Sequence, residues 1–176
     1  LSAANNTIIA HDAGTSGLTI TNSGKIFNTV GEDALRLENS SGTTITNNAG
    51  GEIYTTGSGG VVKLGDSATL INHGEIRNDT SASDRAVWFS GDNSTLTIEE
   101  SSKIVGKIKL QGGTTGNTIQ VNQGYGQTYF YDTEGTGDYT VQDLSGNAIV
   151  KGSAGSVGQG AQESIDERLG LRTYNL

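Results

Sequence analysis

The chain has 176 residues and a formal net charge of −8 at pH 7, and it contains neither cysteine nor proline. The lack of cysteine excludes disulfides, thiolate metal sites and cysteine nucleophiles. The acidic balance argues against nucleic acid or an anionic membrane surface as a partner, because neutralising phosphates requires a basic face. Hydrophobic residues make up only 32% of the chain and glycine occupies 27 positions, which fits either disorder or a narrow fold with few core residues.

A degenerate repeat of about 25 residues starts near the N-terminus. Each unit has a Thr/Ile-rich strand, a Gly-charge-Ile strand and a third strand of alternating apolar and polar residues. This period predicts a solenoid, in which every unit stacks on its neighbours, and the sustained alternation argues against disorder. Segment 7–12 fits the third strand of a preceding, truncated unit. The four units are 18–28 with 34–40, 44–54 with 61–67, 70–78 with 86–93, and 97–105 with 107–113.

The third strand of each unit alternates as a strand with one buried face must. Its predicted inward positions are Leu35/Leu37, Val62/Leu64, Val87/Phe89 and Ile108/Leu110. Its predicted outward positions are Arg36, Lys63, Trp88 and Lys109. Stacking aligns these outward four into a cationic ridge with one exposed aromatic side chain, which is a candidate contact surface for glycans or a partner protein. The alternative is a solvated face without a partner.

Polar columns are predicted on the other two strands. Asn22, Asn47 and Asn72 end the first strand at intervals of 25 residues, on its inward face, and we expect them to form a structural ladder of side-chain amides. Glu99 takes the equivalent place in the fourth unit. On the second strand, stacked at a spacing of roughly 4.8 Å, one outward column contains Lys25, Glu52, Glu75 and Lys103.

Signals for chemistry are weak. Asp66 and Asp92 follow the third strand of adjacent units, where turn carboxylates bind Ca²⁺ in some solenoids, but such residues more often accept backbone hydrogen bonds. His11 and His73 have no partner histidine at ligand spacing. The Thr-x-Thr pairs at 19–21, 44–46 and 95–97 resemble ice-binding arrays, but Ile71 breaks that pattern. We therefore expect no catalytic residue, no metal and no cofactor.

The C-terminal third changes character. The repeats are expected over residues 1–116, a cap or hairpin region over 117–158, and a short helix or linker tail over 159–176. An open last turn would expose strand edges, so we expect aromatic residues on hairpins such as 140–152 to cover it. Segment 160–172 reads as an amphipathic helix, with a solvated tail as the alternative. The cap aromatics are Tyr125, Tyr129, Phe130, Tyr131 and Tyr139.

The repeats resemble a known family. The units LTITNSGKI…DALRLENS (from 18) and TLINHGEI…RAVWFSGDN (from 69) are similar to passenger repeats of bacterial autotransporters (type V secretion), and the change to aromatic hairpins before ESIDERL (163–169) is similar to the end of such passengers. The resemblance implies a right-handed parallel β-helix, displayed on or released from a Gram-negative cell surface. The translocator barrel and the N-terminal bulk of a passenger are not in this sequence, which leaves open a mature chain or an excised piece.

From the repeats and the resemblance together we expect a non-enzymatic, extracellular or cell-surface module for adhesion, self-association or use as a stalk. Its partners would be itself, laterally or end to end, or host and cell-surface glycans or proteins, with no nucleic acid and no direct membrane insertion by this segment. Two alternatives remain. One is a self-assembling extracellular filament subunit, and the other is a fragment of a carbohydrate-active β-helix enzyme, a lyase or a hydrolase.

Overall fold

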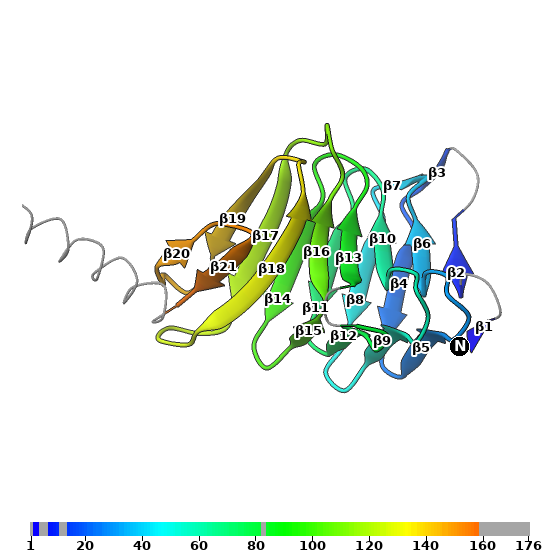
Figure 1. Cartoon of the computed structure of the whole chain (residues 1–176), viewed down its shortest axis with the longest axis horizontal. Helices are drawn as coiled ribbons and strands as arrows, with labels where there is room; N and C mark the ends of the chain where they lie inside the picture. Colours follow the sequence, from blue (N-terminus) through cyan, green and yellow to red (C-terminus); the bar gives the residue numbers. More distant parts are fainter. Residues whose placement is uncertain (1, 4–6, 11–13, 82–83, 159–176) are drawn as a thin grey trace, which may run out of the picture.

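A computed structural model describes residues 2–3, 7–10, 14–81 and 84–158. In this part of the chain the protein is all-β, and its strands stack in parallel into a β-solenoid of about 5 turns with about 25 residues per turn. The predicted all-β parallel solenoid is therefore confirmed. Figure 1 shows the turns following one another along the long axis, with the N-terminal strands at one end and β20 and β21 at the other. Three sheets run along this axis.

The first sheet, here called the Ile sheet, carries the Gly-charge-Ile strands. Its strands pair in parallel and place Ile26, Ile53, Ile76 and Ile104 in one column. The first three of these side chains are buried, because each lies between the strands of neighbouring turns. The sheet contains, in order, β1 (Ser2–Ala3), β5 (Lys25–Asn28), β9 (Glu52–Thr55), β12 (Glu75–Asn78) and β15 (Lys103–Val105).

The second sheet, here called the ridge sheet, carries the alternating strands. Its inward residues fill the core as predicted, and Leu35, Val62 and Phe89 are fully buried. The sheet contains β2 (Ile8–Ile9), β6 (Leu35–Leu37), β10 (Val62–Leu64), β13 (Arg85–Phe89), β16 (Lys107–Leu110), β18 (Tyr129–Gly135), β21 (Ala154–Val157) and β20 (Ile149–Val150). All pairs are parallel up to β18, whereas β18–β21 and β21–β20 are antiparallel.

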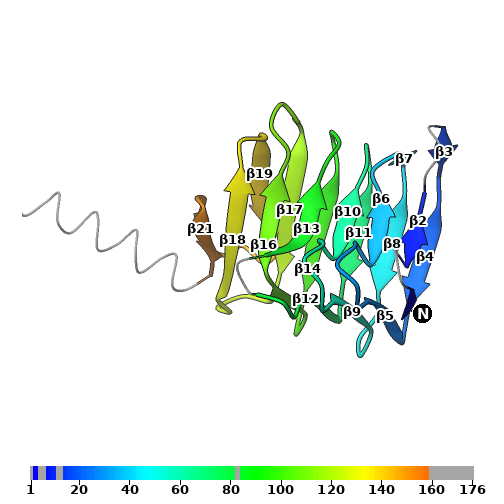
Figure 2. The same ribbon diagram turned by 45° about the vertical axis from the view of Figure 1, so that its right-hand side comes forward.

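The third sheet, here called the Thr sheet, carries the Thr-rich strands. Its parallel ladders keep one register from the first strand to the last. The sheet contains β4 (Thr19–Asn22), β8 (Thr44–Asn47), β11 (Thr69–Asn72), β14 (Thr95–Glu99), β17 (Asn117–Asn122) and β19 (Tyr139–Asp143). A short parallel pair, β3 (Thr15–Ser16) with β7 (Ser40–Ser41), lies at a turn. Figure 2 shows the strands of successive turns side by side from a second direction.

The C-terminal end is built differently from the prediction. Parallel stacking continues beyond residue 116, through β17, β18 and β19. The hairpin predicted over 140–152 does not form, because β19 pairs in parallel with β17, while β20 pairs with β21 in another sheet. The pairing with β17 places Val141 beside the buried Ile119, which a solvent-exposed hairpin would not do.

The cap aromatics divide into two groups. Tyr131 and Tyr139 are buried at the end of the core, and their hydroxyls donate to the carbonyls of Val150 (3.3 Å) and Gly152 (3.2 Å). Tyr129 is partly buried, but Tyr125 and Phe130 are 82% and 71% exposed. Only the first group closes the core as expected. The predicted helix at 160–172 and His11 lie outside the described residues, and no helix among those described has the length and apolarity to span a membrane.

Candidate binding surfaces

The amide ladder is present on the inward side of the Thr sheet. Asn22 Nδ2 donates to Asn47 Oδ1, and Asn47 Nδ2 donates to Asn72 Oδ1, both over 2.8 Å. The fourth member is not Glu99, because Asn72 pairs with Ile98. Thr44, Thr69 and Thr95 are aligned in the Thr sheet. The turn of the coil from Thr69 to Thr95 is therefore one residue longer than the turn from Thr44 to Thr69. The ladder is buried, so it stabilises the fold and offers no contact surface.

The predicted ridge is aligned in one column of the ridge sheet. Lys63 pairs with Arg36 on one side and with Trp88 on the other, and Trp88 pairs with Lys109. The Lys63 and Lys109 ammonium groups lie 4.0 and 4.1 Å from the Trp88 ring centroid, and the Arg85 guanidinium lies at 4.9 Å. The indole is therefore flanked by cations from both neighbouring strands, which is a favourable arrangement of charge over aromatic rings.

One acidic side chain, Glu38, offsets part of the positive charge of this ridge. Glu38 accepts hydrogen bonds from Arg36 and Lys63. Burial acts to raise the pKa of Glu38, but these two bonds outweigh it and lower the pKa. Burial also lowers the pKa of Lys109, helped by the nearby Arg85 charge. Lys63 is only 8% exposed, so the ridge is more enclosed than its sequence predicted.

This geometry weakens the ridge as a glycan site. A sugar stacks on an open aromatic face, whereas the faces of Trp88 are held by Lys63 and Lys109. The indole N–H of Trp88 is buried without a hydrogen-bond partner. The four ridge residues are brought together, but they bind mainly one another and Glu38.

The outer face of the Thr sheet is the more regular surface. One column consists entirely of threonine, with one residue from each of the six strands. Its members are Thr19, Thr44, Thr69, Thr95, Thr118 and Thr140. The second column holds Thr21, Thr46, Ile71, Thr97, Gln120 and Gln142 in the same strand order. Neither column contains an ionisable side chain.

Hydrogen bonds between turns order the C-terminal half of this face. Thr97 Oγ1 donates to Gln120 Oε1 (3.1 Å), and Gln120 Nε2 donates to Gln142 Oε1 (3.0 Å). The hydroxyls of Thr118 and Thr140 share a hydrogen bond of 3.1 Å. Sequence reasoning found the first four threonines and missed Thr118 and Thr140. The signal was available in the Thr-x-Gln pattern of 118–120 and 140–142.

The Ile sheet presents charges instead. Lys25 and Lys103 form ion pairs with Glu52 (2.8 Å) and Glu75 (3.1 Å), as the predicted column implies. Glu52 and Glu75 are neighbours in this column, which places two like charges side by side. Arg77 bridges them, because its Nη1 lies 2.7 and 3.4 Å from the two carboxylates. Two of the three outer faces are therefore charged, whereas the two aligned outer columns of the Thr sheet are uncharged and Glu99 lies beyond them at the end of β14.

The turn carboxylates serve the backbone. Asp66 Oδ1 accepts from the Asp92 N–H, and Asp92 Oδ1 accepts from the Thr115 N–H, both over 2.8 Å. Within the part of the chain that the structure describes, no group of His, Cys, Asp or Glu side chains is arranged to hold a metal ion.

Comparison of the chain with protein-family models, with curated proteins and with solved structures gave no match. The fold and its surfaces therefore define the class of protein, a parallel β-solenoid with one threonine-rich face whose two aligned columns are uncharged.

Proposed function

We propose that the chain is a non-enzymatic, extracellular adhesive module that binds through the outer face of the Thr sheet. The observation that supports this most is the unbroken column of six aligned threonines beside a second uncharged column. A solenoid repeats the same contact at each turn, so contacts that are individually weak add by multivalency. The resemblance of the repeats to autotransporter passengers supports display at a bacterial cell surface.

The ligand we propose is an uncharged, hydroxyl-rich polymer of a cell surface, which means a neutral polysaccharide. The face offers hydroxyl, amide and methyl groups at the strand spacing of about 4.8 Å. It has no cation that would select phosphate, sulfate or uronate groups. β-branched threonine also loses little side-chain freedom on binding, because its χ1 rotamer is already restricted in a strand.

The end-to-end filament is supported less well. In the ridge sheet, parallel stacking stops at β18, and the antiparallel strands β21 and β20 follow. A second copy that continued the parallel coil would have to displace them. Among the described residues, no arrangement favours the carbohydrate-active enzyme, since Glu99 accepts a bond from Asn122 (2.7 Å) and the turn aspartates accept from the backbone.

Co-sedimentation with insoluble cellulose and chitin, and affinity electrophoresis in a soluble neutral glucan, test the proposal. Thr69→Lys/Thr95→Lys places two charges in the middle of the threonine column and is expected to reduce binding at least tenfold. The matched control is Val30→Lys/Tyr125→Lys, which adds the same charges at exposed sites outside the Thr sheet and is expected to leave binding unchanged. Equal binding by both variants, or no binding by the unaltered chain, would overturn the proposal.

A further inference from the structure

The Ile sheet stops before the other two sheets do. Its last strand is β15, whereas the ridge and Thr sheets continue to β18 and β19. The chain between β17 and β18 forms no strand and turns through Gly124 and Gly126, both at positive φ. Figure 1 shows β15 at the end of its row of strands, with the neighbouring sheets extending past it. Among residues 2–3, 7–10, 14–81 and 84–158, no strand takes the place that follows β15 in the Ile sheet.

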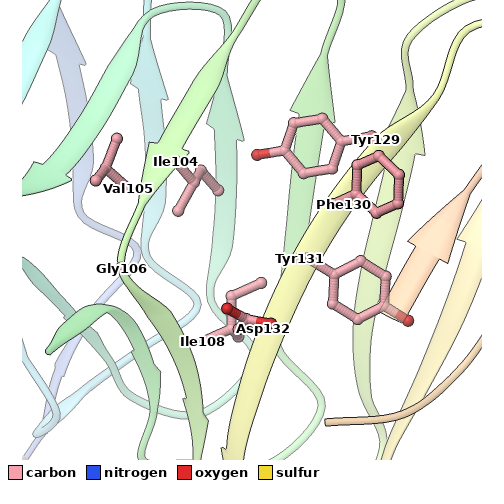
Figure 3. Close-up of a pocket in the computed structure, with 8 residues that line it drawn as sticks. All are labelled: Ile104, Val105, Gly106, Ile108, Tyr129, Phe130, Tyr131 and Asp132. Atoms are coloured by element: carbon pink, nitrogen blue, oxygen red, sulfur yellow. The ribbon is translucent and has the colours of Figure 1, made fainter. Parts of the chain in front are cut away.

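A cleft of about 230 Å³ lies at this place, and Figure 3 shows its lining. Ile104, Val105 and Gly106 form one wall, and the first half of β18, from Tyr129 to Asp132, forms the other. Ile104 is only partly buried, unlike the buried Ile76 in the same column. The cleft thus exposes the end of the isoleucine column.

Both walls present strand backbone to the cleft. The Lys103 N–H donates to Gly74 on the β12 side (2.9 Å), so by alternation the backbone groups of Ile104 point the other way. The Thr133 N–H donates to Ser153 (2.8 Å), and the same alternation along β18 turns the backbone groups of Phe130 and Asp132 away from β21. A strand edge of this kind is a template for an added strand.

Tyr129 occupies part of the space. Its side chain crosses the cleft toward Ile104 in Figure 3. Burial raises the pKa of Tyr129 to about 12, against a smaller opposite effect of the Ile104 backbone. The phenol therefore fills part of the place that the next strand would take.

The outward residues of β15 define the chemistry of that strand. Lys103 pairs with Glu75 on the β12 side and is 66% exposed, so an acidic residue on the incoming strand would lie beside its other flank. Val105 continues the column of Phe27, Tyr54 and Arg77, whose first two rings stack at 5.1 Å. An aromatic residue therefore suits the position beside Val105.

We infer that β15 and the cleft beside it bind an extended peptide of a partner protein, which adds to the Ile sheet as a parallel strand with the pattern acidic, β-branched aliphatic, aromatic. Main-chain hydrogen bonds supply affinity in this mode, and alternate side chains supply specificity. The chain's own strand β9 (Glu52–Thr55), which with the preceding Gly51 reads GEIYT, has this pattern. This inference is independent of the Thr sheet and of its ligand.

The probe is a fluorescent peptide with the sequence GEIYT, and the readout is anisotropy on titration with the full chain. Saturable binding is expected. Ile104→Lys, which places a charge at the end of the isoleucine column, should weaken binding at least tenfold. The control Leu144→Lys adds the same charge at an exposed apolar side chain and should bind as the unaltered chain does.

A charge exchange separates recognition from damage to the fold. Lys103→Glu should weaken GEIYT about threefold to fivefold and strengthen the peptide GKIYT by a similar factor, as expected for a cross-strand ion pair. A variant that merely misfolds would lose both peptides. The inference is overturned if the unaltered chain does not bind GEIYT, if Ile104→Lys leaves binding unchanged, or if Lys103→Glu does not reverse the preference between the two peptides.

Discussion

Single residues in this solenoid act through the columns to which they belong. Asn47 illustrates the point, because its amide accepts from Asn22, donates to Asn72 and also donates to the Gly51 carbonyl (3.1 Å). An isolated buried amide would cost free energy, whereas an amide with all its bonds formed is stabilising. The ladder therefore couples three turns of the coil through side chains alone.

Asn47→Ala is expected to lower the free energy of unfolding by about 2–4 kcal/mol, because the amides on both sides lose partners in a buried site. The measurement is chemical denaturation followed by circular dichroism. Asn48→Ala is the matched control, since Asn48 is only half-buried and its amide donates only to the Ser23 hydroxyl at 2.8 Å among the described side chains. We expect a change below about 0.5 kcal/mol for the control. A similar loss in both variants would show that the ladder has no special role.

At the scale of strands, the sequence predicted the strands that belong to the 25-residue repeat and missed the strands that follow it. The alternation of Leu35/Leu37 and its equivalents defined the ridge sheet, and the Asn spacing defined the Thr sheet. The later strands were missed as parts of the coil, because β17 and β19 have Val121 and Asp143 at the position of the ladder Asn and no Gly-charge-Ile strand follows them. The hairpin predicted over 140–152 was wrong because Ser145 and Gly146, at its centre, suit either a hairpin turn or a corner of the coil, and the packing of the partly buried Val141 beside Ile119 favours the corner.

The candidate surfaces show the same division. The ridge column was predicted in full, but its pairing with Glu38 depends on where the side chain of a turn residue points, which alternation does not give. The cleft at β15 was not predicted, because it arises from a strand that the chain omits at 123–128. An omitted strand leaves no positive signal in the sequence, apart from the glycines at 124 and 126.

The cap strand β21 depends on close approach to a ring. A Cβ atom on Gly155 would lie 2.2 Å from Tyr131 Cζ, so Gly155→Ala should displace β21 from β18 and lower the melting temperature by several degrees. The near-UV circular dichroism of the tyrosines should weaken with it. Gly152→Ala is the matched control, because the nearest atom to its Cβ is 3.7 Å away. Equal melting temperatures for the two variants would contradict this account of the cap.

The whole molecule is a coil with two different ends. At the N-terminal end, β4 is the outermost strand of the Thr sheet. Ile20 within this strand and Leu18 just before it are only partly buried. At the C-terminal end, the ridge sheet turns antiparallel and Tyr131 and Tyr139 close the core. An end-to-end assembly needs both ends open, and a closed end is how solenoids avoid it.

We therefore expect the chain to sediment as one elongated species over a wide range of protein concentration. A sedimentation coefficient that rises steadily with concentration would instead favour the filament subunit. Gly155→Leu supplies the complementary test, because a larger side chain against Tyr131 should displace β21 and expose the edge of β18 to other molecules. If this variant associates while the unaltered chain does not, the cap is what keeps the coil from growing. If both remain single species, the lack of association has another cause, such as mutual repulsion between chains that each carry a net charge of −8. Raising the salt concentration would then allow the chains to associate.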